Sequence, residues 1–186
     1  MSTWAEFAAA APNIARAAAR RWPGITRLAR GEEGAVADGS EVFSLAYLAT
    51  VRADGSPRVH PFCPILAAGR LFAAVPPKSP KGNDLRRDPR CVIHALPGPE
   101  DDELNVRARA TEVGSDPATR ALVVSVVTRS GVGGMIASVS SHPLFEFDIE
   151  QVDVARWIDI GQPGTHAARE RWRAPVGGGS VAGSTQ

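Results

Sequence analysis

The stretch LAYLATVRADGSPRVHPFCPILAAGRLFAAV, residues 45–75, decides the fold of this chain. Its first part, Leu45 to Arg52, is short, apolar and bounded by turn residues, which is typical of a buried strand. Asp54-Gly55 separates it from a second strand-like run, Arg58 to Leu66, and this dipeptide favours a hairpin. A tight turn then leads into a third run, Arg70 to Val75. We therefore expect a meander of three antiparallel strands.

The second of these strands has unusual chemistry. Pro61 and Pro64 have no backbone N–H to donate to a neighbouring strand, so we expect an edge strand or a bulge there. Side-chain alternation places Arg58 and His60 on one face of the strand and Val59 on the other.

Strands and helices alternate irregularly along the rest of the chain. A capping box at Thr3 and a proline at Pro12 predict two N-terminal helices, and Asp116-Pro117 predicts another that runs to Val127. The Gly-rich run 131–134 is interpreted as a turn. Four further strands are expected, at Arg90–Leu96, Leu104–Val113, Leu144–Ile149 and Val152–Ile160. Six or seven short strands predict a mainly β fold, a closed or partly closed antiparallel barrel with peripheral helices.

Three regions follow from this pattern. We expect N-terminal helices and a loop packed on the barrel at 1–43, the barrel domain at 44–173, and a disordered Gly/Ser-rich tail at 174–186.

The composition excludes several classes of protein. A formal net charge of +1 provides no global field for nucleic acid or an anionic membrane, so neither is expected as a partner. No apolar run approaches the roughly 20 residues that span a bilayer. Cys63 and Cys91 form no paired motif and the four histidines have no metal-ligand spacing, so we expect free thiols, a cytoplasmic protein and no metal site.

The best candidate for an anion site is the loop from Lys78 to Asn83. Ser79 is a predicted N-cap, Pro80 suits the first helical position, and Lys81 adds a positive charge. A helix N-terminus offers unpaired N–H groups to a phosphate. The alternative is that Ser79 only caps the helix while the lysines are solvated. Arg58 favours the phosphate site if its strand neighbours the third strand, because guanidinium binds phosphate through two bonds.

Four pieces of the sequence together resemble a known superfamily, the pyridoxamine 5′-phosphate oxidase-like proteins. The pieces are LATVRADGSPRVHP (48–61), GRLFAAV (69–75), KSPKGNDLRRDPR (78–90) and RARATEV (107–113). The resemblance implies a split β-barrel of antiparallel Greek-key or meander type, which binds FMN at the interface of a homodimer. It also implies an FMN-dependent oxidoreductase that transfers hydride to or from a small-molecule substrate.

The resemblance also implies which residues touch the cofactor. They are Arg58, Val59, His60 and Pro61 near the flavin and Ser79 and Lys81 at its phosphate, with Lys78 and Asn83 as adjacent candidates. Pro76-Pro77 departs from the small hydroxyl residues usual in the family. The family's late Arg-x-His substrate signature is absent, so oxidation of vitamin B6 is not expected. No catalytic side chain is identified, and the substrate stays open.

Other cofactors remain alternatives within the same resemblance. A deazaflavin coenzyme needs a longer basic groove, for which Arg86, Arg87 and Arg90 are candidates. A non-enzymatic flavin or haem protein is the other alternative. Haem would require an axial ligand, and the candidates are His60, His94, His142 and His166.

Overall fold

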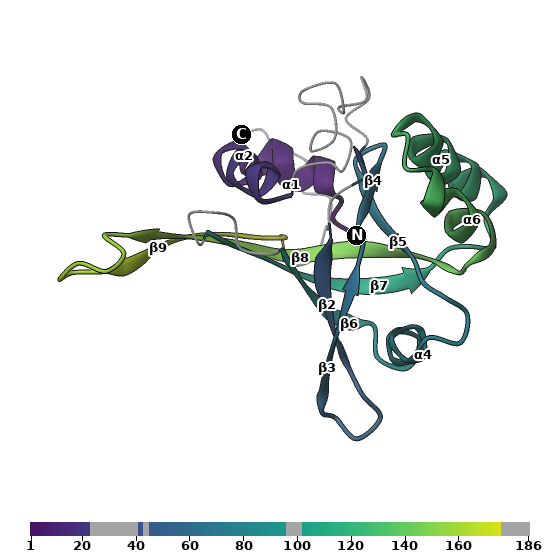
Figure 1. The fold of residues 1–186 in the computed structure, drawn as a ribbon, viewed down its shortest axis with the longest axis horizontal. Helices are drawn as coiled ribbons and strands as arrows, with labels where there is room; N and C mark the ends of the chain where they lie inside the picture. The colour runs from purple at the N-terminus through teal and green to yellow at the C-terminus, as the bar shows by residue number, and fades with distance from the viewer. Residues whose placement is uncertain (23–40, 43–44, 96–101, 176–186) are drawn as a thin grey trace, which may run out of the picture.

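Nine strands in the described part of the chain form one curled antiparallel sheet, a split β-barrel, in this computed structural model (Figure 1). The structure describes residues 1–22, 41–42, 45–95 and 102–175. Neighbouring strands follow the order β1-β4-β5-β8-β7-β6-β2-β3, and β9 pairs with β8. The strands are β1 Glu41–Val42, β2 Ala46–Val51, β3 Pro57–Phe62, β4 Ile65–Ala67, β5 Arg70–Ala74, β6 Arg90–Ala95, β7 Glu103–Glu112, β8 Leu144–Ile158 and β9 His166–Arg173. The helices are α1 Trp4–Ala10, α2 Pro12–Arg21, α4 Pro80–Arg87, α5 Pro117–Arg129 and α6 Gly133–Ser141.

The first hairpin forms where the sequence predicts it. β2 and β3 are antiparallel, with Thr50 opposite Arg58 and Ala49 opposite Val59. Gly55 closes the turn at φ +83°, a conformation that favours glycine. The hairpin extends away from the rest of the sheet, with α4 beside it (Figure 1).

The turn into the predicted third strand forms, but the predicted second strand is not continuous, so the three strands do not make one meander. The run from Arg58 to Leu66 breaks at Cys63-Pro64 into β3 and β4, because Pro64 cannot continue a ladder of N–H donors. β4 and β5 do form a hairpin, but β5 pairs next with β8, and β3 lies at the far edge of the sheet. The predicted phosphate site assumed that Arg58 lies beside the third strand. In the structure it does not.

The C-terminal half differs from expectation in three places. Leu144–Ile149 and Val152–Ile160 are not two strands: a single strand, β8, runs through both because Gln151 pairs with Arg107 in the β7 ladder. β9 was not predicted, since its sequence HAARERWR is polar and mostly exposed. The 131–134 turn is shorter than expected, because α6 begins at Gly133.

Helices cover the sheet in two places, and each cover encloses a core. α1 and α2 pack against β8 and β9, where the Phe7 and Trp172 rings lie 5.2 Å apart and Trp22 is fully buried. α5 and α6 cover β4 and β5, and Val123 and Phe72 are fully buried between them. None of the helices in the described ranges is long and apolar enough to cross a membrane.

Gly69 provides a test of how α1 is held on the sheet. Its φ is +72°, its carbonyl accepts a 3.0 Å bond from the Ala5 N–H, and an added Cβ would lie 2.6 Å from the Ala5 Cβ. We expect Gly69→Ala to lower the free energy of unfolding by about 1–3 kcal/mol, through backbone strain and a forced shift of α1. Gly55→Ala has a similar φ but nothing within 4 Å, so it should cost less, about 1 kcal/mol. Urea unfolding compares the two, and equal losses would exclude the α1 contact as a cause.

Candidate functional site

The N-terminus of α4 leaves its N-cap side chain unused. Ser79 occupies the N-cap with extended backbone angles and Pro80 takes the first helical position, as the sequence predicts. The Ser79 carbonyl accepts the N–H groups of Gly82 and Asn83, at 3.0 and 3.2 Å. Its hydroxyl makes no capping hydrogen bond, contrary to the usual role of an N-cap serine. The hydroxyl is therefore available to a ligand at this helix end.

Lys81, in the first turn of α4, ties the helix to β3. Its Nζ donates to the Pro61 carbonyl at 3.0 Å. Burial lowers the pKa of the Lys81 ammonium, while the nearby Cys63 thiolate form would raise it. The lysine thus brings a positive charge to the place where β3 and α4 meet.

Arg58 reaches the same helix one turn later. Its Nε donates to Asp84 Oδ2 at 2.7 Å, and its side chain is partly buried. No partner for its terminal nitrogens occurs among the described residues. Arg58 and Lys81 are therefore brought together by α4, because Lys81 and Asp84 lie three residues apart on one helix face.

His60 lies between these two cations on β3. Its Nε2 is buried and has no hydrogen-bond partner in the described part of the chain. Burial lowers the pKa of His60 below its ordinary value of 6.5, and the charges of Lys81 and Arg58 lower it further. The imidazole is accordingly neutral near pH 7, with one ring nitrogen unsatisfied.

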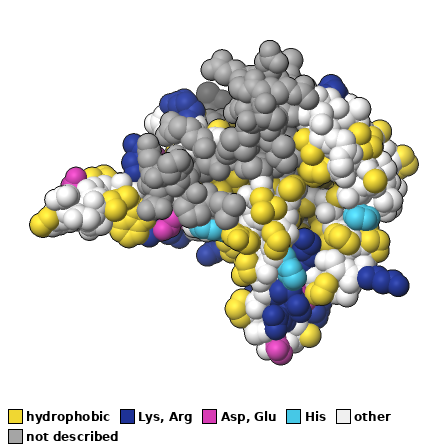
Figure 2. All heavy atoms as spheres, in the orientation of Figure 1, with side chains coloured by type: hydrophobic (Ala, Val, Ile, Leu, Met, Phe, Trp, Pro, Cys, Tyr) yellow, Lys and Arg dark blue, Asp and Glu magenta, His cyan; other side chains and the backbone are white. Residues whose placement is uncertain are grey.

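The remaining predicted residues lie around this group without a described contact to it. Val59 points to the opposite face of the sheet and is 60% exposed, and Lys78 is exposed at the helix end. Asn83 is exposed and accepts from Arg86 Nη1 at 3.4 Å. Figure 2 shows Lys and Arg side chains gathered with a histidine over the β2–β3 hairpin.

Two residues of the site, Asp84 and Thr50, were not singled out in the sequence. Asp84 is 3% exposed and binds, besides Arg58, the Thr50 hydroxyl and the Arg87 guanidinium. Asp84 could have been found from its spacing, because it lies three residues after Lys81 and therefore on the same face of a short helix. Thr50 had none, because its hydroxyl reaches α4 only through the tertiary fold.

The residues proposed for other cofactors are placed differently. Each of the three arginines suggested for a deazaflavin groove has an acidic partner: Arg86 with Glu112, Arg87 with Asp84 and Arg90 with Asp88. Of the other histidines, His94 bonds Asn105 through Nδ1 and His166 bonds the Gly164 carbonyl. His142 forms the C-cap of α6.

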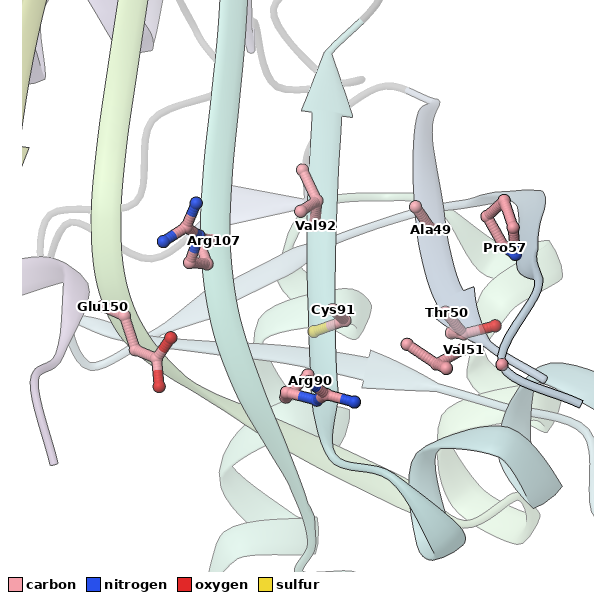
Figure 3. A pocket seen from close by; sticks show the side chains of 10 residues that line it. Ala49, Thr50, Val51, Pro57, Arg90, Cys91, Val92, Arg107 and Glu150 are labelled. Atoms are coloured by element: carbon pink, nitrogen blue, oxygen red, sulfur yellow. The ribbon is translucent and has the colours of Figure 1, made fainter. Parts of the chain in front are cut away.

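A cavity of about 580 Å³ lies on the other face of the sheet (Figure 3). Its floor includes Ala49, Val92 and Arg107, which lie on the adjacent strands β2, β6 and β7. The residues directly before and after each of them in its strand point into the core. Arg90 and Glu150 flank it. We call Arg58 and Lys81, with His60 and Ser79 beside them, the cationic group. None of these four residues lines the cavity, so the cavity is separate from the cationic group.

The depressed pKa of His60 predicts a pH dependence of stability. Because the unfolded chain takes up a proton at His60 before the folded chain does, the unfolding free energy should fall as the pH drops from 6.5 toward the folded pKa. In His60→Gln that decrease should disappear, whereas the exposed His166→Gln should keep it. Chemical unfolding of the three proteins between about pH 5 and 8 measures this. Parallel pH profiles for the wild type and His60→Gln would contradict the prediction.

A family model described as pyridoxamine 5′-phosphate oxidase matches residues 34–161, more than half of the chain. Among curated proteins, none matches.

Solved structures share the fold at low identity. The haem storage protein HutZ from Vibrio cholerae has a TM-score of 0.52 and 21% identity over 58% of this chain and 83% of that one. ChuZ from Campylobacter jejuni has a TM-score of 0.53 and 12% identity over 67% of this chain and 53% of that one. A protein of unknown function from Agrobacterium tumefaciens has a TM-score of 0.51 and 18% identity over 61% and 51%.

Proposed function

The chain belongs to the pyridoxamine 5′-phosphate oxidase family, and from this membership we propose that it is an FMN-dependent oxidoreductase acting on a small molecule. The observation that carries the proposal is the meeting of Arg58 and Lys81 at a helix whose N-cap hydroxyl, that of Ser79, is unused. The family supplies the cofactor class, and this group of side chains supplies a place for its phosphate.

The residues present fit a phosphate monoester. A helix N-terminus contributes partial positive charge, and α4 here carries the Ser79 hydroxyl as a donor. The Lys81 ammonium and the free end of the Arg58 guanidinium add charge-assisted bonds. We assign the phosphate to these three residues, with Lys78 and Asn83 flanking them.

Bound FMN would supply the hydride chemistry through its ring system. The part of this chain is to bind and orient it. The segment 59–61, which follows Arg58 on β3, is proposed to contact the ring. His60 would present a neutral imidazole there, since burial and two cations keep its pKa low. Such a role requires no acid or base pair, and the substrate stays unassigned.

A homodimer forms part of the proposal. The side of β2 and β3 opposite the cationic group exposes the large apolar side chains of Tyr47, at 38%, and Val59, at 60%. Leu45, directly before β2, is 44% exposed. This apolar face continues into the cavity of Figure 3. Exposed apolar surface of this kind is typical of a protein interface. A second copy that covers this face would bury the three side chains.

Haem binding is the second candidate function, and His60 favours it. A buried ring nitrogen without a partner suits an axial iron ligand, and among the described residues His60 is the one histidine that has such a nitrogen. HutZ, which shares the fold, is described as a haem storage protein. The deazaflavin alternative has less support, because its three candidate arginines are already paired with carboxylates.

Titration of the purified protein with FMN, riboflavin, a deazaflavin coenzyme and haem decides among these functions. FMN should bind, with flavin absorbance and fluorescence changes, and more tightly than riboflavin, which lacks the phosphate. Haem binding that His60→Ala abolishes would instead favour the second candidate. If no ligand binds, both functions are excluded. Sedimentation of the same sample tests the homodimer.

A further inference from the structure

Asp84 is a buried carboxylate in the middle of α4, surrounded by donors from three elements. Its Oδ2 accepts from Arg58 Nε at 2.7 Å and from the Thr50 hydroxyl at 3.0 Å. Its Oδ1 accepts from Arg87 Nη2 at 3.2 Å. The carboxylate thus joins the edge strand β3, the neighbouring strand β2 and its own helix.

A charge buried to this degree is retained only when its partners compensate for lost hydration. Burial raises the pKa of Asp84, but the bonds from Arg58, Thr50 and Arg87 outweigh it and leave the pKa below 3.8. Asp84 is therefore ionised at neutral pH.

The geometry of Arg58 shows what the carboxylate does. Only Nε is engaged by Asp84, so the two terminal nitrogens remain without a partner among the described residues. A guanidinium held at Nε has its terminal N–H donors fixed in direction, since the group is planar and rigid. Without this anchor, a long arginine side chain at a strand edge would sample many rotamers.

We propose that Asp84 is a positioning residue that orients the Arg58 fork toward the anion held by Ser79 and Lys81. This inference rests on the FMN-binding function proposed above and assigns to it a residue that does not itself touch the ligand. Thr50 supports Asp84 in the same role, because its hydroxyl binds the oxygen that Arg58 uses.

Replacing Asp84 with asparagine distinguishes positioning from simple charge. Removal of a negative charge makes the site more positive, so Coulomb attraction alone predicts tighter binding of FMN. Loss of the anchor predicts weaker binding, because a neutral amide accepts a weaker bond from Arg58 and turns its NH₂ group toward other donors. The two accounts therefore predict changes of opposite sign in the affinity for FMN.

The experiment measures the dissociation constants of FMN and riboflavin for the wild type, Asp84→Asn, Thr50→Val and Asp88→Asn. Asp88 is a matched control: it is the C-cap of the same helix, and its described side-chain contacts are to Arg90. We expect Asp84→Asn to weaken the binding of FMN about 10-fold and the binding of riboflavin less than about 2-fold. Thr50→Val should weaken FMN about 2- to 3-fold. Asp88→Asn should leave the binding of FMN unchanged or make it slightly tighter.

A double-variant comparison tests whether Asp84 acts through Arg58. In an Arg58→Ala background, Asp84→Asn should not weaken FMN further. The positioning role is overturned if the single variant Asp84→Asn binds FMN as tightly as the wild type or more tightly. It is also overturned if Asp84→Asn weakens the binding of FMN and of riboflavin by the same factor. If Asp84→Asn does not fold, Thr50→Val, which retains the carboxylate and both arginines, carries the same test. A wild type that binds FMN no more tightly than riboflavin refutes the phosphate site itself, which is a separate failure.

Discussion

The double variant Ser79→Ala/Lys81→Ala is expected to bind FMN at least about 100-fold more weakly than the wild type, with riboflavin affected far less. Two of the proposed donors to the phosphate are lost, one hydroxyl and one ammonium. Each bond to a charged group contributes about 1.5–3 kcal/mol, and the two together account for two or more orders of magnitude. Isothermal titration or quenching of flavin fluorescence measures both ligands.

The variant should fold, for reasons visible in the structure. The Ser79 hydroxyl makes no capping bond, so its removal does not cost the usual stability of an N-cap. Lys81 donates one bond to the Pro61 carbonyl, which water can replace because Pro61 is exposed. The matched control is Ser125→Ala/Arg129→Ala, which removes a hydroxyl and a positive charge from α5. A similar loss in this control, or equal loss of FMN and riboflavin, would rule out a phosphate site at α4.

Phe147→Ala should lower the free energy of unfolding by about 3–5 kcal/mol. Phe147 is 1% exposed, lies opposite Leu71 on β5 and Ala110 on β7, and its ring centre is 6.1 Å from that of Phe62. A central strand with neighbours on both sides cannot collapse into the cavity that alanine leaves. Since domains are stable by about 5–15 kcal/mol, this is a large share of the total.

Urea unfolding followed by circular dichroism measures the loss. Ile160→Ala is the control, because Ile160 is 55% exposed and a surface substitution changes stability by about 0.5 kcal/mol or less. A loss below about 1 kcal/mol for Phe147→Ala would mean that the core around Phe62 repacks freely. That result would also question the rigidity of β3, the strand that carries Arg58.

The local features of the fold were predictable because short-range chemistry specifies them. Asp54-Gly55 specifies the β2–β3 turn, the Thr3 capping box starts α1, and Ser79-Pro80 starts α4. Prediction failed where pairing partners are distant in sequence. Glu150-Gln151 looked like an interruption, but β8 continues past a shift of register there, because its residues on both sides pair with β7. The polar β9 had no apolar signal, since it is held as an edge strand by β8.

The candidate site divides in the same way. The sequence by itself predicted the helix start at Ser79-Pro80, where we propose an anion site, because an N-cap, a proline and lysines are local to one turn. Only the tertiary structure decided that Arg58 meets this helix through Asp84 and not through strand neighbours. It also left His60 with an unpartnered nitrogen. Burial and the partners of a charge are properties of the folded sheet, because they depend on segments that meet only when the chain is packed.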